Sequence, residues 1–118
     1  SAWYDRGFIT YNNQAKHDML GVSEETLVEY GAVSEPTVLE MAKGALNSSR
    51  ADISVAITGI AGPGGATPGK PVGTVWFAWA DGPAGRTEVH SESRWIDGDR
   101  EAVRRQAVAV ALQGLLDR

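Results

Sequence analysis

The sequence predicts an α/β protein in which helices cover a mixed β-sheet. Helix-start signals recur along the chain, short β-branched apolar runs alternate with the helical segments, and one pair of strand-like runs is joined by a hairpin-type loop. The chain has 118 residues, 42% of them apolar, with four tryptophans. We therefore expect residues 1–118 to form a single domain with a hydrophobic core of its own.

The N-terminal region predicts a strand followed by a short helix. Residues 8–11 are β-branched and aromatic, which favours a strand. Asn12-Asn13 then indicates a turn or a helix cap leading into a helix over 14–20. Gly21 is suitably placed to end that helix, because glycine readily adopts the left-handed conformation of a C-terminal cap.

Two more helices are predicted before the next strand. Ser23 precedes two acidic residues, which favours a helix start, and Gly31 is placed to end this helix. The following start is clearer, because Ser34 is a good N-cap and Pro36 falls in the first turn. Apolar residues then recur at helical spacing as far as Asn47.

Three strands are predicted after residue 52. Residues 53–57 are almost wholly apolar, which is typical of a strand covered by helices on both faces, and we expect it at the centre of the sheet. Residues 74–80 are apolar at odd and even positions. Residues 86–95 alternate charged with less polar side chains, which indicates a strand nearer the sheet edge. The loop at 81–85 predicts an antiparallel hairpin between the last two.

The final helix is predicted to begin after Asp99, which is placed as an N-cap. Its apolar stripe, which we expect to cover the sheet, is made of Val103, Ala107, Val110, Ala111 and Leu115.

Charge and composition argue against several classes of partner. The net charge is −4 and no cluster of basic residues is present, so we expect no direct nucleic-acid binding. No apolar stretch approaches the ~20 residues that a membrane span needs. The chain has no cysteine, which excludes disulfides and thiolate metal sites. We therefore expect a soluble, cytoplasmic protein without a membrane partner.

Metal chemistry is not favoured either. His17 and His90 are far apart in the sequence, and neither has a second ligand at the spacing of known metal motifs. We expect both to be surface residues, and the prediction is of no metal ion and no cofactor.

The strongest indication of a binding site is the glycine- and proline-rich segment TGIAGPGGATPGKPV at 58–72, which lies between two apolar runs. Positions without side chains let backbone N–H groups approach a ligand. Residues 64–70 satisfy half of a phosphate-binding P-loop pattern. However, Pro71 replaces the magnesium-binding Ser or Thr, and a strand follows where a helix should begin, so ATP binding is not favoured.

Four other residues are candidates for chemistry or ligand contact. Lys16 follows the predicted strand that bears Tyr11, so both groups could reach one pocket. Lys16 is either a solvated surface charge or a base whose pKa is lowered by burial or a nearby cation. Thr58 either finishes its strand or contacts a ligand. Arg100, in the first turn of the last helix, either reaches an anion or makes an exposed salt bridge.

Several segments together resemble one family. They are DRGFITYNNQAKHDMLGV at 5–22, GAVSEPT at 31–37, AITGIAGPGG at 56–65, KPVGTVWFA at 70–78 and GDRE at 98–101. In order and spacing they are similar to the C-terminal domain of competence/damage-inducible CinA proteins, the family of PncC-type nicotinamide-mononucleotide deamidases. The resemblance covers nearly the whole chain. It implies a three-layer α/β/α sandwich that hydrolyses a linear carboxamide, converting nicotinamide mononucleotide and water to nicotinate mononucleotide and ammonia by metal-free serine–lysine acyl transfer.

The resemblance also implies roles for individual residues. Lys16 matches the general base, Tyr11 matches a tyrosine that assists it, and Thr58 matches a contact to the reacting amide. Arg100 matches, more weakly, a contact to the phosphate or to another subunit. The glycines that would shape the nucleotide pocket are Gly59, Gly62, Gly64 and Gly65.

One departure from the family pattern concerns the nucleophile. The family's serine lies in a Ser-Cys-Thr-Gly-Gly segment that opens an N-terminal helix, and these 118 residues contain no such segment. Ser23 and Ser34 are better interpreted as helix caps. We expect a domain that lacks its N-terminal helix, is inactive alone, and pairs with its own N-terminal segment or forms a homo-oligomer through exposed sheet surface. The alternative is a non-catalytic nucleotide-binding or interaction module of a CinA-like protein.

Overall fold

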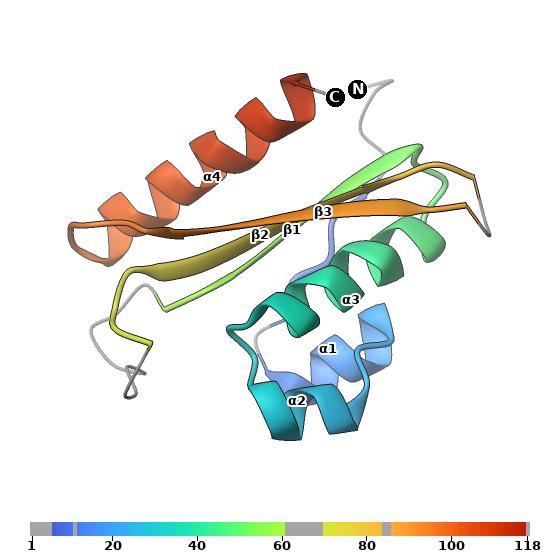
Figure 1. Ribbon diagram of the computed structural model, residues 1–118, viewed down its shortest axis with the longest axis horizontal. Coiled ribbons are helices and arrows are strands. Elements are labelled where there is room, and N and C mark those ends of the chain that lie inside the picture. Colours follow the sequence, from blue (N-terminus) through green and yellow to red (C-terminus); the bar gives the residue numbers. More distant parts are fainter. Residues whose placement is uncertain (1–5, 11, 61–69, 84–85, 118) are drawn as a thin grey trace.

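The structure is a computed structural model that describes residues 6–10, 12–60, 70–83 and 86–117. These residues form helices on both faces of a sheet (Figure 1). The elements, in chain order, are α1 (Asn13–Leu20), α2 (Glu24–Tyr30), α3 (Glu35–Asn47), β1 (Ile53–Gly59), β2 (Thr74–Asp81), β3 (Glu88–Trp95) and α4 (Arg100–Leu116). Helix α4 covers one face of the sheet and α1, α2 and α3 lie on the other, which confirms the α/β/α sandwich.

Every helix begins at a polar cap, as the sequence predicts. The side chains of Asn12, Ser23, Ser34 and Asp99 each accept a hydrogen bond from a backbone N–H three residues further on. Gly21 ends α1 with a φ of 71°, a left-handed conformation that glycine adopts without strain. These local signals therefore fix where the helices start.

The sheet has the strand order β1-β2-β3, and both pairs are antiparallel. Two predictions are corrected here. The sheet formed by the described residues is not mixed, and β1 lies at its edge while β2 lies at its centre. Side chains of a strand point to the two faces of the sheet and not to the neighbouring strands. The apolar residues on both faces of β1 therefore indicate that helices cover both faces, but they do not indicate where β1 lies in the strand order. The prediction that β3 lies at an edge is confirmed.

The predicted strand over residues 8–11 is also corrected. Residues 8–10 have no regular secondary structure and pair with none of the described strands. Phe8 instead packs against the core between the sheet and the helices α1, α2 and α3. Residue 11 lies outside the described residues. Strand propensity alone does not supply the hydrogen-bonded neighbour that a strand requires.

Strand β2 divides the core into two halves. Its side chains alternate, so that Val75, Phe77 and Trp79 pack under α4, whereas Trp76, Ala78 and Ala80 face α3. The predicted apolar stripe of α4 completes the first half, with Val103, Ala107 and Ala111 buried and Val110 and Leu115 packed beside them. The alternation puts Trp76 on the sheet face that carries α1, α2 and α3.

Helix α1 packs unusually closely against α3 at Gly44. A Cβ atom placed on Gly44 would lie 1.7 Å from the carbonyl oxygen of Leu20, the last residue of α1. Only a residue without a side chain allows this approach. The contact fixes the position of α1, the helix that carries Lys16.

Within the described ranges, no helix has both the length and the apolar character needed to cross a membrane.

Candidate active site

Lys16 is buried, with 8% of its surface exposed. Its Nζ donates a hydrogen bond to the main-chain oxygen of Thr10 at 3.0 Å. Burial lowers the pKa of Lys16 from its ordinary value of 10.5, because removal of water disfavours the charged form. Of the two alternatives left open by the sequence, the structure therefore excludes a solvated surface charge, and the pKa of Lys16 is shifted in the direction that a lysine base requires.

The backbone around Lys16 is held at both ends of α1. The Lys16 N–H donates to the Asn12 carbonyl at 3.2 Å, and the Lys16 carbonyl accepts from Val22 at 3.2 Å. The neighbouring His17 places Nδ1 2.8 Å from the Val22 oxygen. The lysine is thus fixed on a short, capped helix with its amine beside the residue that precedes position 11. Tyr11 itself lies outside the described residues.

Thr58 lies near the end of β1 and is 7% exposed. Its hydroxyl donates to the Ala32 carbonyl at 2.7 Å, which ties the end of the strand to the segment between α2 and α3. In the sheet register, Thr58 is directly opposite Trp76. The hydroxyl therefore serves at least a structural purpose, at the edge of the groove described below.

The two ends of the glycine-rich segment are joined by backbone hydrogen bonds. The Ile60 N–H donates to Thr74 at 2.9 Å, and the Gly73 N–H donates to Ile60 at 2.6 Å. Gly59 is opposite Val75, whose side chain would lie 3.1 Å from a Cβ at position 59. Gly62, Gly64 and Gly65 lie outside the described residues. The described ends of the segment are therefore held together beside Thr58.

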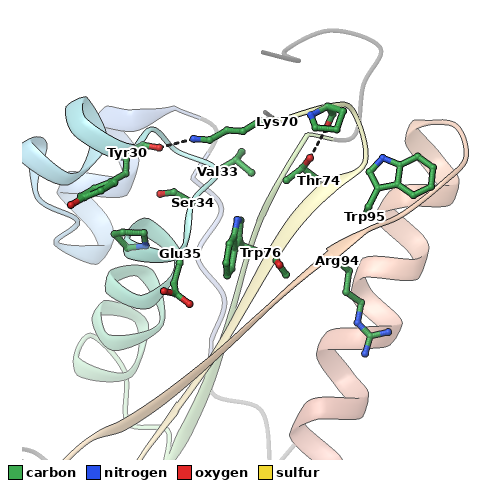
Figure 2. A pocket seen from close by; sticks show the side chains of 12 residues that line it. Tyr30, Val33, Ser34, Glu35, Lys70, Thr74, Trp76, Arg94 and Trp95 are labelled. Carbon is green, nitrogen blue, oxygen red and sulfur yellow. Dashed lines mark hydrogen bonds between the residues drawn. The ribbon is translucent and has the colours of Figure 1, made fainter. Parts of the chain in front are cut away.

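A groove of about 810 Å³ opens between the corner where α2 meets α3 and the strands β2 and β3 (Figure 2). It is lined by Tyr30, Val33, Ser34, Glu35, Pro36, Lys70, Pro71, Thr74, Trp76, Ser93, Arg94 and Trp95. Lys70 Nζ donates to the Tyr30 carbonyl at 2.6 Å across the mouth of the groove. The Glu35 carboxylate accepts a hydrogen bond from the Ser91 hydroxyl at 2.7 Å. The groove thus combines aromatic walls with charges of both signs.

The predicted site residues fall into separate places. Thr58 is the sheet neighbour of groove-lining Trp76, but neither Thr58 nor Lys16 lines the groove itself. Arg100, in contrast, begins α4 on the opposite face of the sheet and does not line the groove. The described part of the site is therefore built on one sheet face, without Arg100.

Sequence reasoning did not single out Glu35, Lys70, Trp76 or Trp95, which line the groove. The alternation of residues 86–95 does put Ser93 and Trp95 on one face, and the register aligns Ser93 with Trp76. The shared face of Ser93 and Trp95 was the one feature of the sequence that could have indicated this part of the groove. The contribution of α3 depends on tertiary packing, which no local pattern encodes.

The histidines do not form a metal site with other described residues. In the described parts of the chain, no group of three or more His, Cys, Asp or Glu side chains could hold a metal ion. His90 is exposed, as expected, but His17 is half-buried against Val22. The prediction that His17 is a surface residue is corrected, because its ring also helps to close the end of α1.

The fold and the site define an α/β/α domain with a buried lysine and a ligand-sized groove beside a glycine-rich segment. The family model of the CinA C-terminal domain matches residues 1–118. The chain belongs to the CinA C-terminal domain family.

Named relatives and solved structures agree with this assignment. The chain is 59% identical over 115 residues to "Nicotinamide-nucleotide amidohydrolase PncC" of Escherichia coli K12, covering 98% of this chain and 68% of the relative. It is 53% identical over 118 residues to a "CinA-like protein" of Akkermansia muciniphila, covering 99% of this chain and 28% of that protein. The crystal structure of competence/damage inducible protein CihA from Agrobacterium tumefaciens superposes with a TM-score of 0.86 and 50% identity, covering 96% of this chain and 67% of that one.

Proposed function

We propose that this chain is the larger part of an amidohydrolase that converts nicotinamide mononucleotide and water to nicotinate mononucleotide and ammonia. The observation that carries the proposal is the burial of Lys16, which lowers the pKa of its amine and so reduces the cost of the neutral form. A neutral lysine is a base able to activate a hydroxyl group at moderate pH. The identity of 59% to a relative named as a nicotinamide-nucleotide amidohydrolase supports the choice of substrate.

The proposed chemistry is acyl transfer in two steps. Neutral Lys16 takes the proton of a serine hydroxyl as its oxygen attacks the carboxamide carbon, and the carbonyl oxygen becomes an oxyanion. Collapse of this intermediate breaks the C–N bond, and protonated Lys16 gives its proton to the leaving nitrogen, which departs as ammonia. Water then attacks the serine ester with Lys16 again acting as base, which releases the carboxylate and restores the serine.

Other residues would support these steps. Tyr11 would assist Lys16 through its hydroxyl, and Thr58 would contact the reacting amide. Backbone N–H groups of the glycine-rich segment would stabilise the oxyanion, because glycine permits close approach. The glycines assigned to the pocket are Gly59, Gly62, Gly64 and Gly65. Helix α4 lies on the other face of the sheet. Arg100 would therefore contact only a phosphate that is bound by another subunit.

We propose further that the nucleophilic serine is not one of these 118 residues. Ser23 and Ser34 accept hydrogen bonds from the first turns of α2 and α3, so both act as helix caps. The 118-residue chain alone would not turn over substrate. It would pair with an N-terminal segment of its own protein or form a homo-oligomer, in the cytoplasm where its nucleotide substrate is available.

The test is product analysis with the protein expressed from its complete gene. Ammonia release and formation of nicotinate mononucleotide are measured for the wild type, Lys16→Ala and Lys43→Ala. Lys43 is the matched control, because it is exposed on α3 and does not line the groove. We expect the wild type and Lys43→Ala to turn over the substrate and Lys16→Ala not to do so. A well-folded wild type without turnover would remove the deamidase assignment.

The second candidate is a non-catalytic nucleotide-binding module. It is favoured by the similarity to a CinA-like protein of which this chain matches only 28%, so that the domain there is one part of a larger protein. This candidate expects saturable binding of nicotinamide mononucleotide by the complete protein, with no ammonia released over hours.

A further inference from the structure

We propose that the groove beside α3 recognises a zwitterionic mononucleotide, with Lys70 binding the phosphate and Glu35 and Trp76 binding a positively charged ring. The inference rests on the proposed function, because it assigns the part of the substrate that does not react. It adds a specificity that the reaction itself does not require.

The groove has the size and lining of a small-molecule site. Its volume of about 810 Å³ is within the ~300–1,000 Å³ of typical ligand pockets. Tyr30, Trp76 and Trp95 line it from three different elements, α2, β2 and β3. Trp76 is half-buried, and Figure 2 shows its indole within the groove, between Glu35 and the strands. A ring stacked on this indole would be sheltered from water without being enclosed.

Lys70 provides a positive charge at one end of the groove. Its Nζ donates to the Tyr30 carbonyl, which is neutral, and no described carboxylate forms an ion pair with it. An ammonium group has three hydrogens, so two remain for a ligand. Figure 2 places Lys70 at one end of the groove, beside Tyr30. An anionic group of a ligand would neutralise the charge of Lys70, whose described partner is the neutral carbonyl group of Tyr30.

Glu35 provides a negative charge on another wall of the same groove. One oxygen of its carboxylate accepts a hydrogen bond from Ser91, and the other has no described partner. Arg94 also lines the groove, but it is paired with Glu92 and its guanidinium points away from Lys70 in Figure 2. A pyridinium ring over Trp76 would therefore meet a π face and a carboxylate, the two groups that favour an aromatic cation.

The proposed contact between Thr58 and the reacting amide fits this arrangement. Trp76 is directly opposite Thr58 in the sheet, on the same face. A ring on Trp76 can thus direct its carboxamide toward Thr58 while its phosphate extends toward Lys70. The charges of the groove match a nucleotide that is both cationic at the ring and anionic at the phosphate.

The first test separates the phosphate from the ring. Binding of nicotinamide mononucleotide and of nicotinamide riboside, which lacks the phosphate, is measured by calorimetry in the complete protein carrying Lys16→Ala to prevent turnover. Adding Lys70→Met should weaken mononucleotide binding roughly tenfold or more and leave riboside binding unchanged. Lys43→Met is the matched control and should change neither. Equal loss for both ligands, or no loss, overturns the assignment of Lys70.

A second variant guards against a purely structural effect. Lys70→Gln removes the charge but keeps an N–H donor for the Tyr30 carbonyl. It should melt within a few degrees of its parent and still lose the preference for the mononucleotide. Retained preference in Lys70→Gln would show that Lys70 acts only as a tether for α2.

The ring assignment is tested with the reduced mononucleotide, whose ring carries no positive charge. The parent protein should bind the oxidised form more tightly than the reduced form, and Glu35→Gln should reduce that ratio about tenfold. An unchanged ratio overturns the assignment of Glu35. These binding results also separate the two proposals. If the predicted differences in ligand binding are found but the wild type releases no ammonia, only the deamidase proposal fails. If ammonia is released but the predicted differences in binding are absent, only the assignment of the groove fails.

Discussion

The Nζ of Lys16 donates a hydrogen bond to the main-chain oxygen of Thr10 at 3.0 Å, inside the contact of α1 with the rest of the domain. Among the described residues this carbonyl is the only hydrogen-bond partner of that amine, and no described carboxylate pairs with it. A buried lysine without an anionic partner is uncommon, because the charged form loses its hydration without an equivalent gain. Lys16 is therefore the residue on which the proposed chemistry depends most.

The pH dependence of turnover follows from the lowered pKa of Lys16. The base must be neutral, so kcat in the complete protein should rise with pH to a plateau, with a midpoint below the ordinary lysine value of 10.5. A stopped assay of ammonia release from pH 6 to above the ordinary lysine value of 10.5 measures the profile. A rate that is independent of pH throughout, or a midpoint at about 10.5, would contradict the role of Lys16 as base.

The stability of the domain should also depend on Lys16. Its pKa is lower in the folded than in the unfolded chain, so its contribution is fully present above 10.5 and is lost as the pH falls through the lowered value. Lys16→Met should therefore raise the free energy of unfolding at pH 7 by about 1 kcal/mol and flatten its rise toward high pH. Urea unfolding at several pH values measures both. The prediction would be wrong if Lys16→Met lowered the free energy of unfolding at pH 7 and left its dependence on pH unchanged.

Thr58→Val should destabilise the protein, because it removes the hydrogen bond that holds the end of β1 to the segment between α2 and α3. The variant keeps the shape of the side chain but removes the hydroxyl that donates to Ala32. Leaving a buried carbonyl unsatisfied costs roughly 1–3 kcal/mol, whereas Thr58→Ser retains the donor and should cost less. Thermal unfolding of both variants measures the difference. Equal stability of the Val and Ser variants would show that the hydrogen bond from Thr58 to Ala32 does not anchor the strand.

Gly44→Ala should destabilise the protein despite the better helix propensity of alanine. In an open helix this substitution is favourable by about 1 kcal/mol. Here the new Cβ would overlap the Leu20 carbonyl, so α1 must move and the net cost should be roughly 1–3 kcal/mol. Lys43→Ala, at an adjacent exposed position, serves as the control and should stay within about 0.5 kcal/mol of wild type. A neutral or stabilising Gly44→Ala would show that α1 is not fixed by this contact.

The sequence predicts helix boundaries well because their determinants are local. Asn12, Ser23, Ser34 and Asp99 each satisfy an N–H three residues away, so a short window contains the whole interaction. The faces of the strands are predictable for the same reason, since alternation is a property of neighbouring residues. Both kinds of prediction are confirmed in α3, α4 and β3.

The strand order and the groove depend on contacts between distant residues. An apolar run such as β1 has the same local pattern at the centre or at the edge of a sheet. The burial of Lys16 depends on α1 packing against Gly44, and the groove requires α2, α3, β2 and β3 to meet. The roles of Lys16, Tyr11 and Thr58 in catalysis stay predictions, because geometry near them does not measure chemistry.

The most direct test of the central claim is to locate the acyl group on the enzyme. The complete protein is mixed with nicotinamide mononucleotide, quenched in acid within a turnover, and mapped by peptide mass spectrometry. The account predicts an ester on a serine outside residues 1–118, present in the wild type and absent in Lys16→Ala. An ester on Ser34 or Ser93, which line the groove, or turnover without any covalent intermediate, would contradict it.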